Sequence, residues 1–263
     1  MKRKKNIVLI SVIAFFALAF LCASAYVVFK GILNNESKDD YNSVASSYAS
    51  NIEDSTEITS PSEINVEKPE NPVDFDALIK KNPDIYSWIY MPDTHINYPV
   101  CRHATEDNFY LDHDIYGNYS YAGAIYSQFC NSREYSDRVT VLYGHNMADG
   151  SMFADLHKLK DKDFFDKNKY FYIYTESRKL TYEIVSAFVY DDRHIMNTFD
   201  FSDDKVFEDY LAMIKNPRSV SGNVRDKISL DINDKIVVLS TCLNSGDGRY
   251  LVQGVLINDE QTK

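Results

Sequence analysis

Cysteine, glycine and proline are scarce in this sequence, whose 263 residues include four cysteines, nine glycines and seven prolines. So few cysteines exclude a disulfide-rich scaffold, and so little glycine and proline excludes a collagen-like or elastic chain. Acidic residues outnumber basic ones by 39 to 28, and the resulting formal charge of −11 argues against a general nucleic-acid-binding protein. Hydrophobic residues make up 44% of the chain, enough for a folded core in one or two domains.

The start of the chain is basic and apolar, unlike the remainder. Residues 1–30 contain five basic residues and no acidic one, which leaves 23 basic and 39 acidic residues in 31–263. Ile7–Phe29 carries no charge and, at about 1.5 Å per residue, a helix of this length crosses a hydrocarbon core of roughly 30 Å. The cluster Lys2–Lys5 should stay in the cytoplasm by the positive-inside rule. We therefore expect a single-pass cell-membrane protein with its N-terminus inside and its catalytic domain on the extracellular face.

Two other interpretations of this leader remain open. Ala23-Ser24-Ala25 resembles a signal-peptidase site, and cleavage there would release the protein, although a cleaved signal usually has an apolar region of only about 7–15 residues. Cys22 would suggest a lipoprotein, but Leu21 before it is bulkier than the small residue expected at such a site. The uncleaved anchor is the favoured interpretation.

The composition divides the chain into three parts. Residues 1–30 form the basic tip and the anchor, 31–72 an extracellular linker, and 73–263 the folded domain. The linker is polar and has three prolines near its end. Within it, apolar residues of 41–52 recur at helical spacing, which fits either a short amphipathic helix or a transient helix in a flexible tether.

The domain from Val73 onward is predicted to be mainly β. Asp74 caps a short expected helix that ends near Lys80, and Ile85–Tyr90 is interpreted as a further turn. Two longer helices are expected, at Ser151–Leu159 and Asp203–Asn216. Segments rich in β-branched and aromatic residues predict strands at His95–Cys101, Gly123–Ser127, Val139–Tyr143, Tyr170–Thr175, Leu180–Tyr190, Ile236–Thr241 and Tyr250–Ile257. About seven strands with few helices favour a β-barrel or a sandwich.

Two of the predicted strands end in residues that can carry chemistry. An apolar strand from Val139 runs into Gly144-His145, and another from Ile236 runs into Cys242, with Arg249 opening the strand that follows. If the strands are neighbours, Cys242 can attack a peptide carbonyl and His145 can transfer protons. Arg249 can stabilise the oxyanion or hold the substrate backbone. Each residue has a structural alternative, because a cysteine at the end of a buried strand is usually a small hydrophobe and an arginine on a strand is usually a surface charge.

At these residues the sequence resembles a known family. Leu239–Cys242 with Arg249, and Leu142–Met147 about a hundred residues earlier, resemble the sortases. The Asn-Met pair after the histidine and the long insert Asp191–Ile228 before the cysteine strand are similar to class B. Asn108–Leu111 and Tyr121–Tyr126 add to this resemblance, which covers roughly residues 73–260.

The resemblance implies a fold and an activity. Sortases are membrane-anchored cysteine transpeptidases of Gram-positive bacteria, built on a closed β-barrel of about eight strands, with N-terminal helices and, in class B, a helix inserted before the cysteine strand. They cleave a C-terminal sorting motif of secreted proteins after its threonine, and class B members often recognise motifs like Asn-Pro-x-Thr-Asn. The acyl group then passes to an amine of the peptidoglycan precursor or cross-bridge, and some members build pili.

The resemblance also assigns roles to residues of this chain. It implies that His145, Cys242 and Arg249 are catalytic and that the motif pocket is lined by Leu111, Ser240, Thr241 and Asn108, with Asp107 as the alternative to Asn108. Class A members bind calcium, but the pattern of that site is not seen, so no metal and no cofactor is expected. Since only three cysteines lie outside the anchor, Cys101 and Cys130 are expected to be free thiols.

Two rival functions are weighed against this one. A secreted cysteine peptidase or cell-wall hydrolase is disfavoured because papain-like enzymes place the cysteine before the histidine, and because the His-Gly-Cys pattern of L,D-transpeptidases is absent. A non-enzymatic surface adhesin is the second rival, and selective alkylation of Cys242 would argue against it. The other histidines are scattered along the chain and predict no zinc site.

Overall fold

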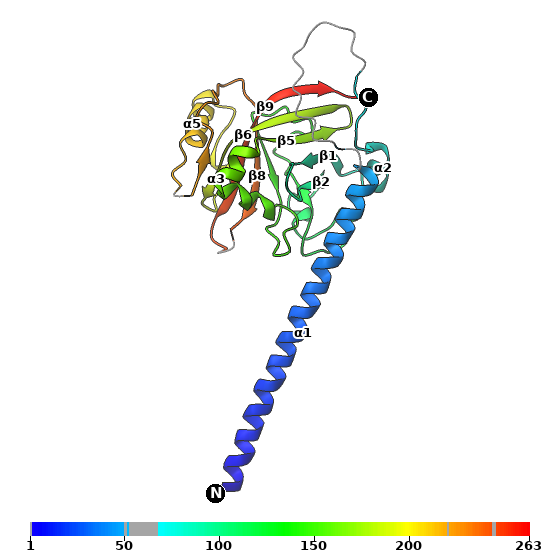
Figure 1. Cartoon of the computed structure of the whole chain (residues 1–263), viewed down its shortest axis with the longest axis vertical. Coiled ribbons are helices and arrows are strands. Elements are labelled where there is room, and N and C mark those ends of the chain that lie inside the picture. Colours follow the sequence, from blue (N-terminus) through cyan, green and yellow to red (C-terminus); the bar gives the residue numbers. More distant parts are fainter. Residues whose placement is uncertain (1, 50–51, 53–67, 220, 244–245) are drawn as a thin grey trace. The chain divides into compact units, whose positions relative to one another are not determined.

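The computed structural model describes residues 2–49, 52, 68–219, 221–243 and 246–263 (Figure 1). The chain divides into two units, Met1–Asp40 and Tyr41–Lys263. Part of the segment predicted to be a linker, residues 50–51 and 53–67, lies outside the described residues. The first helix, α1 (Lys2–Tyr48), contributes to both units. In the first unit, Val12–Phe29 has a mean hydropathy of 2.5 with no residue buried, so by length and composition it can cross a membrane.

The end of α1 belongs to the second unit and packs into its core. Tyr41 and Val44 are buried, and the Tyr41 hydroxyl donates a hydrogen bond of 2.8 Å to the Gly123 carbonyl. The Tyr41 ring meets Tyr98 edge-on, with ring centroids 5.5 Å apart. Residues 41–48 are thus helical, as one of the two interpretations expected, but they are the end of α1 and not a separate short helix, and the second unit begins ahead of Val73.

Eight strands of the second unit close into a barrel (Figure 1). The order around the ring is β5-β1-β2-β3-β4-β8-β9-β6, and β6 pairs back onto β5, while β7 adds a short ninth strand beside β6. The predicted closed barrel of about eight strands is thus confirmed. The strands are β1 (Ile85–Tyr90), β2 (Asn97–Cys101), β3 (Ile125–Tyr126), β4 (Val139–Tyr143), β5 (Tyr170–Thr175), β6 (Arg178–Tyr190), β7 (Asn223–Val224), β8 (Ile236–Cys242) and β9 (Arg249–Gln261).

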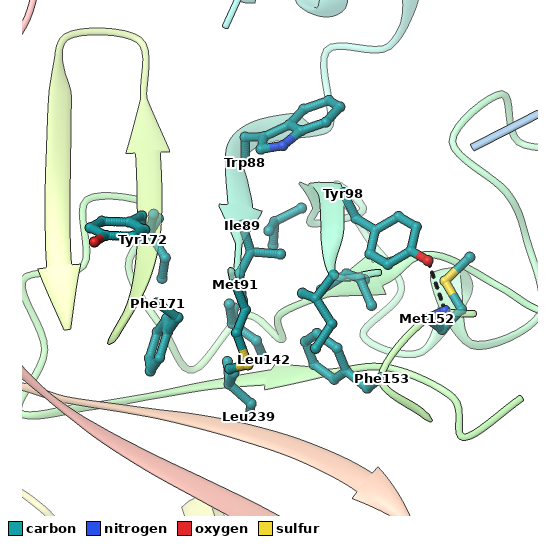
Figure 2. Close-up of a cluster of buried hydrophobic side chains, with 14 of the residues drawn as sticks. Trp88, Ile89, Met91, Tyr98, Leu142, Met152, Phe153, Phe171, Tyr172 and Leu239 are labelled. Carbon is teal, nitrogen blue, oxygen red and sulfur yellow. Dashed lines mark hydrogen bonds between the residues drawn. The ribbon is translucent and has the colours of Figure 1, made fainter. Parts of the chain in front are cut away.

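The barrel is filled by alternate side chains of its strands. Ile89, Leu142 and Leu239 are fully buried in this interior, where Figure 2 shows them with neighbouring aromatic and aliphatic side chains. The intervening residues of β4 and β8, such as Val141 and Val238, pack into a second apolar cluster on the outside. Both strands are therefore buried on two faces, which explains their nearly continuous apolar sequence.

Helical segments contribute buried side chains to this outer cluster. Helix α5 (Asp204–Lys215), expected from its spacing, buries Phe207 and Tyr210 and begins after the capping carboxylate of Asp203. Asp74 likewise caps α2 (Phe75–Lys81), as expected from the sequence. The remaining helical segments are η1 (Phe109–Leu111), η2 (Ala154–Lys160), α3 (Lys162–Lys167) and α4 (Ile195–Thr198).

Some elements differ from the prediction. Ile85–Tyr90 is not a turn but strand β1, because its backbone pairs with β2 on one side and β5 on the other. The segment Ser151–Leu159 does not form the expected α-helix. A 3₁₀ helix, η2, forms instead; it begins at Ala154, three residues after the expected start, and has no side-chain cap. Strand β7 and helix α3 were not predicted, and both are only a few residues long.

Candidate active site

His145 and Cys242 lie at the ends of two neighbouring parallel strands. In the β4–β8 pair, Tyr143 is in register with Ser240, so the two residues that follow at the same interval are His145 and Cys242. The Gly144 amide still donates to the Ser240 carbonyl at 3.1 Å, which ties the exit of β4 to β8. The two apolar strands that end in Gly144-His145 and in Cys242 are therefore adjacent, which is the condition for the two side chains to act together.

Gly144 is at a point where a larger residue does not fit. A Cβ atom there would lie 2.5 Å from Ile125 Cδ1 and 2.7 Å from Phe153 Cδ2, both on buried side chains. The glycine therefore lets the chain leave the strand against the packed core and carry His145 to the barrel rim.

Arg249 reaches the same rim from the hairpin partner of β8. Cys242 and Arg249 are directly opposite each other in the antiparallel β8–β9 pair. Side chains at such positions lie on the same face of the ladder. Gly248, with φ of +96°, precedes the arginine, and a Cβ atom there would be 2.6 Å from the Tyr190 carbonyl oxygen. Arg249 donates to the Gly248 carbonyl at 3.1 Å, which leaves further guanidinium donors for a substrate.

A cavity of about 280 Å³ joins the residues singled out from the sequence. It is lined by His145, Cys242 and Arg249, and also by the four residues expected in the motif pocket, Leu111, Ser240, Thr241 and Asn108. Asp107 is not among the described residues lining this cavity, because its carboxylate accepts the Phe129 amide at 2.7 Å. Between the two alternatives of the sequence, Asn108 is therefore the residue at the cavity.

The His145 ring is held on two sides. Its Nε2 atom is 2.7 Å from the Leu111 carbonyl oxygen, and the Tyr121 ring stacks on it at 6.1 Å. A carbonyl oxygen can only accept, so this contact puts a proton on Nε2 and leaves Nδ1 as the nitrogen that exchanges a proton in the neutral ring. The Leu111 carbonyl is itself confined, since a Cβ atom on Gly123 would be only 2.6 Å from its oxygen.

Several side chains in the cavity wall were missed by sequence reasoning. Gln128 donates to Asn108 Oδ1 at 3.0 Å and, through Oε1, contacts His194 Nε2 at 2.7 Å. The Tyr143 hydroxyl lies 3.2 Å from the same His194 nitrogen. Burial raises the pKa of Tyr126 in this wall to about 12, with a smaller rise from Cys242 and an opposing effect of Arg249. These contacts form a hydrogen-bonded network of side chains in the wall of the cavity that Cys242 lines.

Two more missed residues contact the backbone of the cysteine. Asn146 donates from Nδ2 to the Cys242 carbonyl at 3.1 Å, and His157 Nε2 is 3.0 Å from the same oxygen. Asn146 was noted only as part of the motif after the histidine. His157 carried no signal in the sequence, because its link to Cys242 arises only when η2 packs on the barrel against β6 and β9.

The other cysteines are unpaired thiols. Cys22, Cys101 and Cys130 form no disulfide, nor does Cys242, so the predicted free state of Cys101 and Cys130 is confirmed. Burial raises the pKa of the Cys101 thiol well above its usual range and also raises that of Cys130. Within the described residues, no cluster of three or more histidine, cysteine or acidic side chains could hold a metal ion.

A closed barrel with a cysteine, a histidine and an arginine at one cavity defines a class of cysteine transpeptidase. The family model described as "Sortase domain" matches residues 89–257, and the chain belongs to the sortase family. Within that family it is a class B sortase, on the evidence of its relatives.

The relatives are sortases B of several bacteria. Sortase B of Listeria monocytogenes is 37% identical over 68% of this chain and 72% of its own length, and that of Staphylococcus aureus is 29% identical over 64% and 67%. The crystal structure of sortase B from Bacillus anthracis in complex with AAEK1 superposes with a TM-score of 0.70 at 30% identity, covering 86% of this chain and 99% of that one. Clostridium perfringens sortase B gives 0.63 at 32% identity, covering 70% and 99%.

Proposed function

We propose that this sortase is a membrane-anchored extracellular transpeptidase that cleaves a C-terminal sorting motif of secreted proteins after its threonine. The acyl group is held as a thioester on Cys242 and is transferred to a peptidoglycan-linked amine. The observation that carries this proposal is the convergence of Cys242, His145 and Arg249 on one cavity from the ends of three adjacent strands. Strand ends fix side-chain geometry better than loops do.

The two half-reactions follow from the groups in the cavity. The Cys242 thiolate attacks the threonine carbonyl carbon, an S–C bond forms, and the C–N bond breaks as His145 protonates the departing amine. An incoming amine then gives its proton to His145 and attacks the thioester, which releases Cys242 with the new amide formed. Arg249 donates hydrogen bonds to the oxyanion in both steps, from its position opposite Cys242.

The motif is bound by the wall that includes Leu111, Asn108, Ser240 and Thr241. Leu111 has 45% of its surface exposed, so it offers an apolar contact at the rim. Because the side-chain oxygen of Asn108 already accepts a hydrogen bond from Gln128, its side-chain nitrogen is the group that can donate to a substrate. Such a donor suits the side-chain carbonyl of an asparagine, which supports an Asn-Pro-x-Thr-like motif. A sortase B–substrate complex of Staphylococcus aureus superposes on this chain with a TM-score of 0.62 at 28% identity, which supports a substrate of the same class.

The apolar part of α1 is proposed to anchor the enzyme. Val12–Phe29 is long and apolar enough to span a bilayer, and the basic residues Lys2–Lys5 hold the N-terminus in the cytoplasm. In this arrangement residues 1–30 form the tip and anchor, and 31–72 connect the anchor to the catalytic domain, with Tyr41 and Val44 already buried in the same unit as that domain. Residues 73–263 hold the catalytic groups on the extracellular face. No metal or cofactor takes part in the proposed reaction.

The test is a peptide assay with the full chain in detergent. A panel of quenched pentapeptides, including Asn-Pro-x-Thr-Asn sequences, is incubated with and without amine acceptors, and the products are identified by mass spectrometry. Cleavage after threonine, with transfer to the amine, is expected. Cleavage with no transfer to any amine would favour the peptidase alternative, and transfer only to a lysine of a pilin-like protein would favour pilus assembly.

A further inference from the structure

The backbone carbonyl of Cys242 lacks the backbone amide donor that a continuing β4 strand would provide. In the parallel β4–β8 pair, the Ser240 carbonyl accepts the Gly144 amide, and two residues further the Cys242 carbonyl would accept the amide of residue 146. Strand β4 ends at Tyr143, however, and the chain turns away there to present His145 at the cavity. The change of chain direction that brings His145 to the cavity therefore leaves the Cys242 carbonyl without a backbone amide donor from β4.

Two side chains replace the missing amide. Asn146 donates from Nδ2 at 3.1 Å, and His157 contacts the same oxygen through Nε2 at 3.0 Å. A carbonyl oxygen has two lone pairs, so these two donors use its full capacity. Neither residue is among those that line the cavity in the described part of the chain, so they act on the cysteine peptide from behind the site.

The surroundings of His157 determine the protonation state and the tautomer of its ring. Its Nδ1 atom is buried and has no hydrogen-bond partner among the described residues, while its ring stacks on Tyr250 at 4.9 Å. Burial lowers the pKa of His157, the bond to the Cys242 carbonyl opposes this, and Lys160 lowers it further. A second proton would place an unpartnered N–H on Nδ1, so the ring is neutral and donates from Nε2.

We propose that His157, together with Asn146, is a positioning residue that holds the peptide after Cys242 and thereby aims the thiol at the scissile carbonyl. The inference rests on the proposed role of Cys242 as the nucleophile. Without the His157 donor, the end of β8 loses a fixed hydrogen bond beside the reacting atom, and a displacement of about 1 Å there costs on the order of 100-fold in rate. The substrate wall is untouched, so binding of the peptide should change little.

The experiment uses the full chain in detergent and compares two variants. His157→Leu removes the donor, and His157→Gln keeps an amide N–H that can reach the same carbonyl. Lys160→Met is the matched control, since it lies on the same η2 segment and its ammonium sits 5.1 Å from the same Tyr250 ring. The readouts are kcat and KM of peptide cleavage, the rate of Cys242 alkylation by iodoacetamide, and the melting temperature.

The expected result is specific to a positioning role. In His157→Leu, kcat falls by about 10- to 100-fold with KM changed by less than about twofold, and the alkylation rate of Cys242 changes as well. His157→Gln recovers most of kcat, and Lys160→Met behaves like the wild type. Equal activity of the leucine and glutamine variants, or a loss that simply follows the melting temperature, would overturn the proposal.

Two further variants keep the test decisive. If His157→Leu does not fold, Asn146→Asp replaces the second donor by an acceptor of the same size, and unchanged kcat in that variant would overturn the proposal. Cys242→Ala separates this inference from the function on which it rests. If Cys242→Ala is inactive while His157→Leu is fully active, only the positioning role fails, whereas activity of Cys242→Ala would mean that the proposed function itself fails.

Discussion

Cys242 and Arg249 face each other as the last residue of β8 and the first residue of β9. Directly opposed residues of an antiparallel pair have Cβ atoms about 4.5–5.5 Å apart and side chains on one face. The spacing of the thiol and the guanidinium is therefore set by the ladder of two long strands and not by the turn between them. A geometry held in this way suits an oxyanion donor, which must be in place before the charge develops.

Arg249→Lys should lower kcat by about 10²–10³-fold, because lysine cannot reproduce the planar donors of the guanidinium. Stability should change little, since the hydrogen bond of Arg249 within the described residues goes to the adjacent Gly248 carbonyl. Arg178→Lys on β6, which contacts Asp259, is the control. Near-wild-type cleavage by Arg249→Lys would remove this residue from the active site.

Gly144→Ala should destabilise the barrel by about 1–3 kcal/mol, because the new methyl group meets Ile125 and Phe153 at distances below 3 Å. Urea unfolding of the full chain in detergent measures the change. Gly31→Ala is the matched control, since a Cβ atom there has nothing within 4 Å. Equal unfolding midpoints for the two variants would mean that the exit of β4 tolerates a side chain.

Much of the barrel could be predicted because several strands carry a strong local signal. The strands Val139–Tyr143 and Tyr170–Thr175 have the bounds expected from their β-branched and aromatic residues. Ile85–Tyr90 has a similar composition, but it follows a short helix and a proline, and its strand state depends on pairing with the adjacent β2 and with the distant β5. The helical spacing of Ser151–Leu159 was real, yet Met152 has φ of +55° and delays the helical turns.

Tyr41→Phe should cost about 1–3 kcal/mol of stability, because the Gly123 carbonyl then loses the hydroxyl that donates to it in a buried environment. The ring contact with Tyr98 is preserved in this variant, so only the hydrogen bond is removed. Tyr119→Phe, at a tyrosine with 74% exposure, serves as the control. If both variants unfold at the same urea concentration as the wild type, the hydrogen bond from Tyr41 to Gly123 does not stabilise the second unit.

The stability of the protein should depend on His157 below neutral pH. Burial lowers the pKa of this histidine in the folded state below its ordinary value of about 6.5, so the unfolded chain takes up the proton first. The stabilisation is fully present above about pH 6.5 and is lost as the pH falls from there toward the folded pKa. Between pH 7 and pH 5, the unfolding free energy should therefore decrease more in the wild type than in His157→Gln. Parallel drops in both proteins would contradict the neutral state of His157.

The site could be predicted only where its residues lie at strand ends. His145 and Cys242 follow apolar runs, and Arg249 follows a polar turn, so each has a local signal. His194 and Gln128 are 66 positions apart and meet only through the fold, as do His157 and Cys242 at 85 positions apart. Such contacts depend on how loops and short helices pack on the barrel. Local sequence patterns do not reveal this packing.

The most direct test of the account is to observe the acyl group on Cys242. The full chain in detergent is mixed with an Asn-Pro-x-Thr-Asn peptide without an amine acceptor, quenched in acid, and measured by intact mass and peptide mapping. Cys130→Ala, at an exposed thiol, is the control that should behave like the wild type. We expect an adduct with the mass of the peptide up to its threonine, located on Cys242, removed by hydroxylamine and absent in Cys242→Ala. Turnover by Cys242→Ala, or an adduct located on another residue, would contradict it.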